Sequence, residues 1–365
     1  NKTNVACVLT KSSTPAAPVI WCKKIKNIGK ARALIVNSGN ANAHTGKKGL
    51  QTVKETVNYL SYNLGCKTNE VYVCSTGVIG EFLNTKKITS SIPKLIEQEA
   101  SSWKEVAESI CTTDTFIKGA KANCFIDDTN YKIVGIAKGS GMIFPNMGTM
   151  LAFIFTDLPL PSNILNRLLK EAVEKSFNSI TVDGDTSTSD TCLLFSLNSK
   201  PLNKSIKNIG DKRIQLFKKS LDNVLQSLAQ QIVCDGEGAS KFITVKVNAV
   251  KSYKIAKEIA LSVANSSLVK TAIAGEDPNW GRIVMAIGKE GSSIIQDKIS
   301  ISINKVKITH KGALVNNYKE EVVAKKMKSK NIEIDINMGT GKESATIWTC
   351  DLTKEYIKIN ADYRS

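Results

Sequence analysis

The feature that most constrains this chain is a segment in which a glycine-rich loop leads directly into an apolar strand. Residues 138–148 read Lys-Gly-Ser-Gly-Met-Ile-Phe-Pro-Asn-Met-Gly, and their glycines and proline argue against a regular helix or strand. Residues 149–156 are apolar with β-branched and aromatic members, which predicts a buried strand. The fold must therefore place an irregular loop at the entrance of its core, with Gly148 and Thr149 at the junction.

Thr149 is a candidate nucleophile because of its place at this junction. If the chain cuts itself before Thr149, this residue gains a free α-amine with a pKa of about 7.7–8.0, which acts as a base near neutral pH. A threonine paired with its own N-terminal amine is a recognised activated nucleophile. The alternative is an ordinary strand residue after a turn, and the local residues alone favour that alternative.

The length and hydropathy of the chain predict a large α/β protein. Its 365 residues suggest two domains or one large α/β unit. No run of 18 apolar residues is present, so we expect no transmembrane helix. The chain begins Asn-Lys-Thr with neither an initiator Met nor the apolar region of a signal peptide, so we expect further residues before it in the natural protein.

The net charge of +17 raises the alternative of a basic nucleic-acid-binding protein. Only five of the 50 basic residues are Arg, although base readout and bidentate phosphate binding favour Arg. The lysines are scattered and form no long block, which is typical of a solvated surface. We therefore predict no nucleic-acid partner.

The cysteines and histidines restrict the chemistry further. The nine cysteines contain no CxxC pair, and without a secretory signal they indicate reduced thiols in a cytoplasmic protein. The only histidines are His44 and His310, which excludes a zinc site of several histidines, and neither lies beside an obvious nucleophile motif. The sequence predicts no metal site, and an amine-based mechanism becomes relatively more favourable.

Two further loops follow predicted strands and carry candidate site residues. Val71–Cys74 leads into Ser-Thr76-Gly77, whose hydroxyl and backbone N–H are donors of the kind that an oxyanion hole needs. The alternative there is a plain tight turn. Glu237 lies between two glycines before a strand and is a candidate contact for a cationic substrate group; the alternative is a lone exposed carboxylate. The polar turn at 111–118 suggests no chemistry.

Hydrophobic periodicity predicts the main elements along the chain. The helices expected are 50–64, 90–110 with Pro93 in its first turn, 162–177, 213–232 and 253–274. The strands expected include 5–9, 33–36, 71–74, 131–137, 149–156, 242–250, 283–287, 299–308, 332–336, 345–349 and a short one at 356–360.

Taken together, separated motifs of this chain resemble the ornithine acetyltransferase (glutamate N-acetyltransferase) family. The resemblance runs over nearly the full length, in matching order and spacing. Its carriers are Val36-Asn-Ser-Gly-Asn-Ala-Asn-Ala43, Ser75-Thr-Gly-Val-Ile-Gly80, Lys138-Gly-Ser-Gly-Met142 through Gly148-Thr149-Met-Leu-Ala-Phe153, Asp235-Gly-Glu237-Gly-Ala239, Gly275-Glu-Asp-Pro-Asn-Trp-Gly-Arg282 and Ile359-Asn-Ala-Asp-Tyr-Arg-Ser365.

The resemblance reverses the local interpretation of Thr149 and implies the site residues. It implies self-cleavage between Gly148 and Thr149, where many members have Ala in place of this Gly, and an oxyanion pair at Thr76 and Gly77. The substrate contacts that it implies are Thr76, Lys138, Thr149, Glu237, Asn360 and Ser365. Within that set we assign Glu237 to the side-chain ammonium of ornithine.

The implied reaction is acetyl transfer from N2-acetylornithine to glutamate in arginine biosynthesis, by a ping-pong acetyl-enzyme on Thr149 without metal or cofactor. Whether acetyl-CoA is a second acetyl donor stays open. The alternative enzyme is a self-cleaving aminopeptidase or amidase of similar fold, in which water is the acceptor.

The resemblance also implies the architecture. We expect an α/β fold in which mixed sheets lie between helical layers, with a smaller C-terminal lobe from about 240. The α chain would be 1–148 and the β chain 149–365, the two would stay associated, and an α2β2 heterotetramer is expected.

Overall fold

The computed structural model describes residues 3–144, 150–290 and 294–362, which form two compact units. Unit 1 comprises residues 1–178 and 185–232, and unit 2 comprises 179–184 and 233–365. The described residues contain three β-sheets and eleven α-helices, so the predicted α/β fold with mixed sheets and helical layers is confirmed. Gly148, Thr149 and Ser365 lie outside the described residues.

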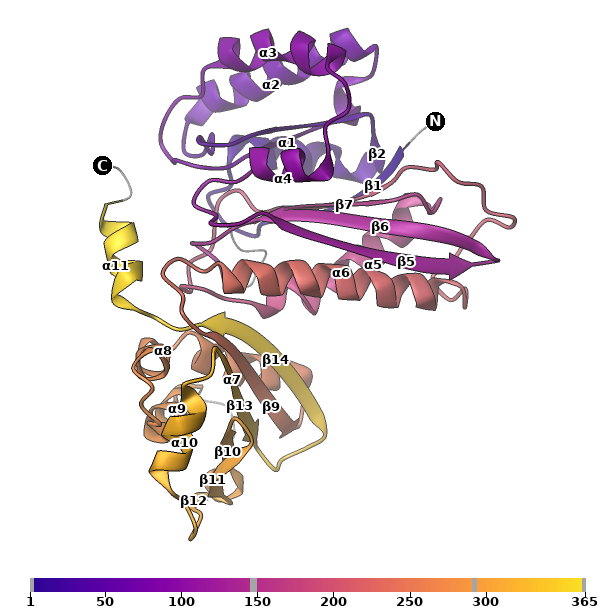
Figure 1. Cartoon of the computed structure of the whole chain (residues 1–365). Helices are drawn as coiled ribbons and strands as arrows, with labels where there is room; N and C mark the ends of the chain where they lie inside the picture. The colour runs from indigo at the N-terminus through magenta and orange to yellow at the C-terminus, as the bar shows by residue number, and fades with distance from the viewer. Residues whose placement is uncertain (1–2, 145–149, 291–293, 363–365) are drawn as a thin grey trace. The chain divides into compact units, whose positions relative to one another are not determined.

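Unit 1 is built around a mixed six-stranded sheet with the order β2-β1-β8-β7-β6-β5 (Figure 1). Its strands are β1 (Thr3–Leu9), β2 (Lys30–Ala31), β5 (Lys118–Ile126), β6 (Thr129–Lys138), β7 (Leu151–Thr156) and β8 (Thr191–Ser196). Neighbouring strands are antiparallel except β7 and β8, which are parallel. The described part of the predicted strand 149–156 is thus β7, and it occupies a central position.

Helices cover both faces of this sheet, as Figure 1 shows for α5 and α6 on one side and α1 and α4 on the other. Alternation along β6 explains the two faces. A Cβ on Gly135 would lie 2.8 Å from Leu228 of α6, whereas Ile136 packs in the cluster on the opposite face. The helices of unit 1 are α1 (Ala17–Ile25), α2 (Gly46–Leu64), α3 (Thr85–Glu97), α4 (Trp103–Ser109), α5 (Ser162–Glu174) and α6 (Ile214–Cys234).

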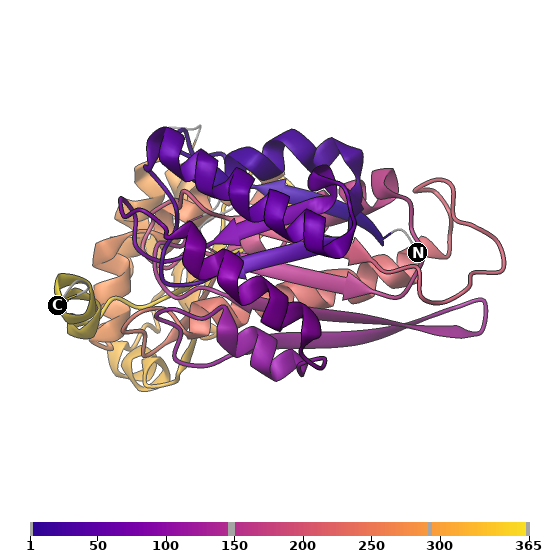
Figure 2. The same ribbon diagram turned by 90° about the horizontal axis from the view of Figure 1, so that it is seen from above.

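A two-stranded parallel sheet of β3 (Ala33–Asn37) and β4 (Val71–Ser75) forms a further layer of unit 1. Tyr72 and Cys74 of β4 pack in the core cluster shared with the large sheet, whereas Val71 and Val73 face the cluster with α2. Figure 2, seen from above, shows the indigo and purple helices of this layer lying over the strands. The small sheet therefore packs against apolar residues on both faces, and this packing positions the loops that follow β3 and β4.

Unit 2 contains the second mixed six-stranded sheet, with the order β12-β11-β10-β13-β9-β14. Apolar residues alternate along its strands and pack against α7 and α9, while polar residues occupy the other face. The strands are β9 (Phe242–Val250), β10 (Ser300–Ile303), β11 (Val306–His310), β12 (Ala313–Leu314), β13 (Asn331–Asn337) and β14 (Glu343–Cys350). The helices are α7 (Tyr253–Ala264), α8 (Ser267–Ala274), α9 (Trp280–Gly288), α10 (Glu320–Met327) and α11 (Lys354–Ala361).

Two predicted helices are each divided in the structure. The predicted helix 90–110 is α3 and α4, and Pro93 lies inside α3 rather than in a first turn. The division arises because Ser102 and Glu105 form a capping box that begins a new helix. The predicted helix 253–274 is α7 and α8, because the Ser266 hydroxyl caps the second helix by accepting from the Val269 N–H.

Two predicted strands are helices, and the predicted strand 299–308 is a hairpin. Residues 283–287 lie in α9, where Ile283, Ala286 and Ile287 are buried at helical spacing. Residues 356–360 lie in α11, which begins after the capping residue Thr353. Residues 299–308 turn back between β10 and β11 at Asn304 and Lys305, both with positive φ.

Candidate active site

The segment that carries the predicted cleavage junction leaves and re-enters the large sheet at one place. Lys138 ends β6, and Leu151 begins β7, and these two residues are antiparallel partners. Between them, Met150 is buried, and its N–H donates to Asp190 Oδ1 over 3.0 Å. The chain that follows Thr149 is therefore fixed beside Lys138, although Gly148 and Thr149 themselves lie outside the described residues.

Thr76 and Gly77 follow β4, in a loop that is in close contact with the loop after β3. The Ser75 hydroxyl donates to Asn37 Oδ1 over 2.5 Å, and the Thr76 N–H donates to the Asn37 carbonyl over 3.1 Å. Gly77 has φ of +126°, and a Cβ there would lie 2.2 Å from the carbonyl carbon of Gly39. Only glycine fits this position, so close backbone contact with Gly39 fixes the conformation of the loop that carries the predicted oxyanion pair.

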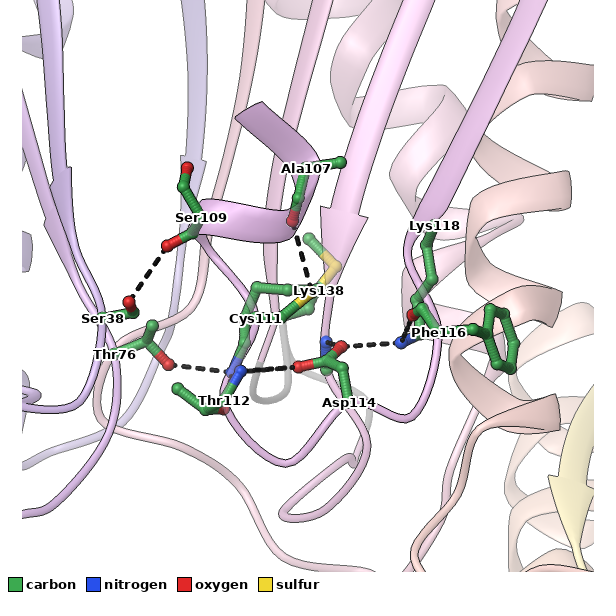
Figure 3. A network of polar contacts seen from close by, with 12 residues as sticks. Ser38, Thr76, Ala107, Ser109, Cys111, Thr112, Asp114, Phe116, Lys118 and Lys138 are labelled. Carbon is green, nitrogen blue, oxygen red and sulfur yellow. Dashed lines mark hydrogen bonds and ion pairs between the residues drawn. The ribbon is translucent and has the colours of Figure 1, made fainter. Parts of the chain in front are cut away.

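Lys138 reaches Thr76 directly. Its Nζ donates to Thr76 Oγ1 over 3.0 Å and to Thr112 Oγ1 over 2.7 Å, and both Lys138 and Thr76 are buried (Figure 3). The structure thus brings together two of the predicted site residues, from the ends of β6 and β4. The start of β7 lies beside them through the Lys138–Leu151 pair.

A buried carboxylate that the sequence did not single out lies beside Lys138. Asp114 Oδ1 accepts from Lys118 Nζ over 2.6 Å and from the Gly139 N–H over 2.7 Å, and Oδ2 lies 3.9 Å from Lys138 Nζ (Figure 3). Burial by itself would raise the pKa of Asp114, but the Lys138 and Lys118 ammonium groups outweigh it and lower that pKa. Asp114 is therefore an anion in the folded protein. It belongs to the polar turn 111–118, for which the sequence suggested no chemistry.

Asp190 is the second buried carboxylate near the junction. It is fully buried, and burial raises its pKa well above the usual range, against the opposing hydrogen bond from the Met150 N–H. Within the described residues Asp190 Oδ2 has no hydrogen-bond partner. No local signal in the sequence distinguishes it from the other carboxylates of the polar stretch 183–190, because its burial depends on tertiary packing.

In unit 2, Glu237 and Asn360 lie side by side. Asn360 Nδ2, on α11, donates to Glu237 Oε2 over 2.9 Å. The loop that carries Glu237 is held because Asp351 Oδ1 accepts from the N–H groups of Ser240 and Lys241 over 2.8 and 2.9 Å. The pair is solvent-accessible, so the carboxylate is available to a cationic group.

Among the residues that the structure describes, no group of three or more His, Cys, Asp or Glu side chains has the arrangement of a metal site. None of the helices described is long and apolar enough to cross a membrane.

Comparison with known proteins gives a consistent result. The ArgJ family model matches residues 1–365. The "arginine biosynthesis bifunctional protein ArgJ" of Mesorhizobium japonicum is 48% identical over 366 residues, which cover 100% of this chain and 89% of the relative. The protein of the same name from Zymomonas mobilis is 47% identical over 363 residues, covering 100% of this chain and 88% of the relative.

Among solved structures, this chain is similar to the arginine biosynthesis bifunctional protein argJ from Bacillus halodurans. The TM-score is 0.54 at 35% sequence identity, and the match covers 58% of this chain and 98% of the crystallised chain.

Proposed function

This chain belongs to the ArgJ family, and on that premise we propose that it transfers the acetyl group of N2-acetylornithine to glutamate in arginine biosynthesis. The observation that carries the proposal is the Lys138–Thr76 hydrogen bond beside the start of β7. A predicted oxyanion donor, a predicted substrate contact and the strand that follows the predicted nucleophile thereby converge in one place.

We assign the chemistry to the chain's own groups. Cleavage between Gly148 and Thr149 frees the Thr149 amine, which takes the proton of the Thr149 hydroxyl while its oxygen attacks the acetyl carbonyl. Thr76 and Gly77 stabilise the oxyanion, a contribution of roughly 3–4 kcal/mol per donor in comparable sites. The amine returns the proton to ornithine as it leaves, and glutamate then attacks the acetyl ester on Thr149. Neither a metal nor a cofactor takes part in this proposal.

Glu237 and Asn360 are the proposed contacts of the amino-acid part, together with Ser365 at the C-terminus. Their hydrogen bond supports this assignment because it fixes one oxygen of Glu237 and leaves the carboxylate accessible. Opposite charge then favours the side-chain ammonium of ornithine over a neutral side chain.

The division into an α chain (1–148) and a β chain (149–365) is part of the proposal, as are an α2β2 assembly and a cytoplasmic location.

The relatives' name "bifunctional" motivates a second acetyl donor, and we propose acetyl-CoA for that role. The two alternative functions, an amidase with water as acceptor and a basic nucleic-acid-binding protein, are not favoured by membership of this family.

The test has two parts. Intact mass under denaturing conditions should give one species that ends at Gly148 and one that begins at Thr149. The cleaved protein should convert N2-acetylornithine and glutamate to ornithine and N-acetylglutamate, and Thr149→Ala should stay whole and inactive. A single full-length species that is nevertheless active would refute the nucleophile. Release of free acetate at a rate independent of glutamate would support the amidase instead.

A further inference from the structure

The donor and acceptor roles at Thr76 follow from the chemistry of Lys138. A lysine ammonium has three donors and no acceptor, so in the 3.0 Å contact Thr76 Oγ1 must accept. The hydroxyl hydrogen of Thr76 is then directed away from Lys138 and is available to another acceptor. The charge on Lys138 also polarises the Thr76 O–H bond, which makes it a stronger donor.

Lys138 needs a counter-charge to stay an ammonium in this place. It is 4% exposed, and burial disfavours the charged form of lysine. Lys118, whose side chain is fully buried, adds a like charge nearby. Among the described residues, two carboxyl groups face Lys138: Asp114, with Oδ2 3.9 Å from Nζ, and Asp190, which also interacts electrostatically with Lys138. Burial raises the pKa of Asp190 well above its usual range, so Asp114 is the one of the two that is held as an anion.

Asp114 is held in a fixed position from which it supplies the counter-charge to the Lys138 ammonium. Its side chain is fully buried, and it contacts three parts of the chain: its own turn, Lys118 at the start of β5 and Gly139 just after β6. Figure 3 shows Asp114 between the two lysines, with Lys138 pointing on toward Thr76. The carboxylate cannot move without breaking the contacts at Lys118 and Gly139, so its distance to Lys138 is fixed.

We propose that Asp114 is a positioning residue of the acetyl-transfer reaction, which holds Lys138 as an ammonium against Thr76 so that the Thr76 hydroxyl donates its hydrogen to the oxyanion. Asp114 acts through Lys138 and Thr76 and does not touch the substrate. This inference rests on the proposed function, because it assigns a role within that reaction.

The central experiment compares Asp114→Asn with Asp114→Glu. Asparagine keeps an oxygen for the Gly139 N–H but removes the charge, so Lys138 should lose its proton at a lower pH. We expect kcat to fall about 10–100-fold, since removal of one oxyanion donor costs about 100–1,000-fold, while KM for N2-acetylornithine stays within about threefold. The basic limb of the kcat–pH profile should move to lower pH in Asp114→Asn and stay in place in Asp114→Glu, which retains the charge.

A control is available at Asp157, which accepts one backbone N–H (Lys132, 2.7 Å) and pairs with one lysine (Lys200, 3.0 Å). Asp114 accepts two backbone N–H groups, from Thr112 and Gly139, and lies near two lysines. Asp157→Asn should leave both kcat and the pH profile unchanged. If Asp114→Asn behaves like this control, or raises KM without lowering kcat, the positioning role is overturned.

A measurement on uncleaved protein separates this inference from the proposed function. In a Thr149→Ala background, the 1H–15Nζ signal of Lys138, identified by its loss in Lys138→Met, should disappear at a lower pH when Asp114→Asn is added. An unchanged titration overturns the inference, even if acetyl transfer is confirmed. If the wild-type protein fails to transfer acetyl groups while the titration moves, the proposed function fails and the Asp114–Lys138 coupling stands.

Discussion

Gly77→Ala is the substitution for which the structure gives the most definite expectation. The added Cβ would lie 2.2 Å from the carbonyl carbon of Gly39, 2.5 Å from its oxygen and 2.6 Å from the Asn40 nitrogen. All three atoms are backbone, so no side chain can rotate away. Relief of the overlap requires the two loops to separate by about 1 Å, given ordinary contact distances of about 3.5–4 Å.

The magnitude follows from two contributions. An alanine at φ +126° costs about 1–2 kcal/mol in left-handed strain, and the overlap adds about 1–3 kcal/mol. For a unit of this size the melting temperature should fall by about 5–15 °C. A displacement of about 1 Å at a positioned catalytic group costs on the order of 100-fold in rate, so we expect kcat to fall about that much.

Gly80→Ala is the matched control, because Gly80 also has a positive φ, +89°, but its Cβ would meet nothing within 4 Å. It should lose about 1–2 kcal/mol of stability from strain alone and keep kcat within about twofold. Scanning calorimetry and steady-state acetyl transfer measure both quantities. Equal melting temperatures and equal kcat values for the two variants would refute the argument that backbone contact at Gly39 specifies this loop.

Two further predictions concern carboxylates in different surroundings. Glu237→Gln should raise KM for N2-acetylornithine about tenfold and change glutamate turnover much less, because the lost charge faces the ornithine ammonium; equal losses on both sides, in steady-state assays of each substrate, would contradict that assignment. Asp190→Asn should stabilise the protein by about 1–3 kcal/mol at pH 8, because burial disfavours the ionised carboxylate and raises the pKa of Asp190, and the neutral amide of the variant carries no such cost. Since the pKa of Asp190 is raised on folding, the wild-type protein loses stability as pH rises above about 4, so the advantage of the variant should shrink toward that pH in thermal melts. A destabilised Asp190→Asn would indicate that its carboxylate is compensated.

The sequence predicted a helix or strand correctly where the hydrophobic periodicity within that element was long enough to identify it. Ile243, Val245 and Val247 alternate along β9, and Leu221, Leu225 and Leu228 repeat along α6, so burial on one face predicts each element. The pattern failed where it was short. Residues 283–287 suit a strand or a helix equally, and tertiary packing of Ile283, Ala286 and Ile287 decided for the helix.

Some residues of the candidate site were likewise predictable from the sequence, and others were not. Thr76 and Lys138 were recognised because each lies in a motif, and the structure joins them by a hydrogen bond. Asp114 lies in a polar turn, and such a turn in a sequence suggests a solvent-exposed side chain. In the structure the side chain is fully buried, and it contacts Lys118 at the start of β5 and the Gly139 N–H after β6. Such burial has no one-dimensional signature, so a structure is needed to find it.

The strand order of the large sheet has a consequence for how this protein can recover from denaturation. β7 and β8 follow residue 149, yet β8 pairs with β1 and β7 pairs with β6, and both partners precede residue 148. Cleavage at Gly148–Thr149, as proposed, leaves the two middle strands on one polypeptide and their outer neighbours on the other. Refolding of the cut protein is then a second-order process whose rate falls on dilution, whereas the uncut chain refolds at a rate independent of its concentration. Cutting would thus turn one chain that can refold alone into two chains whose separation is difficult to reverse.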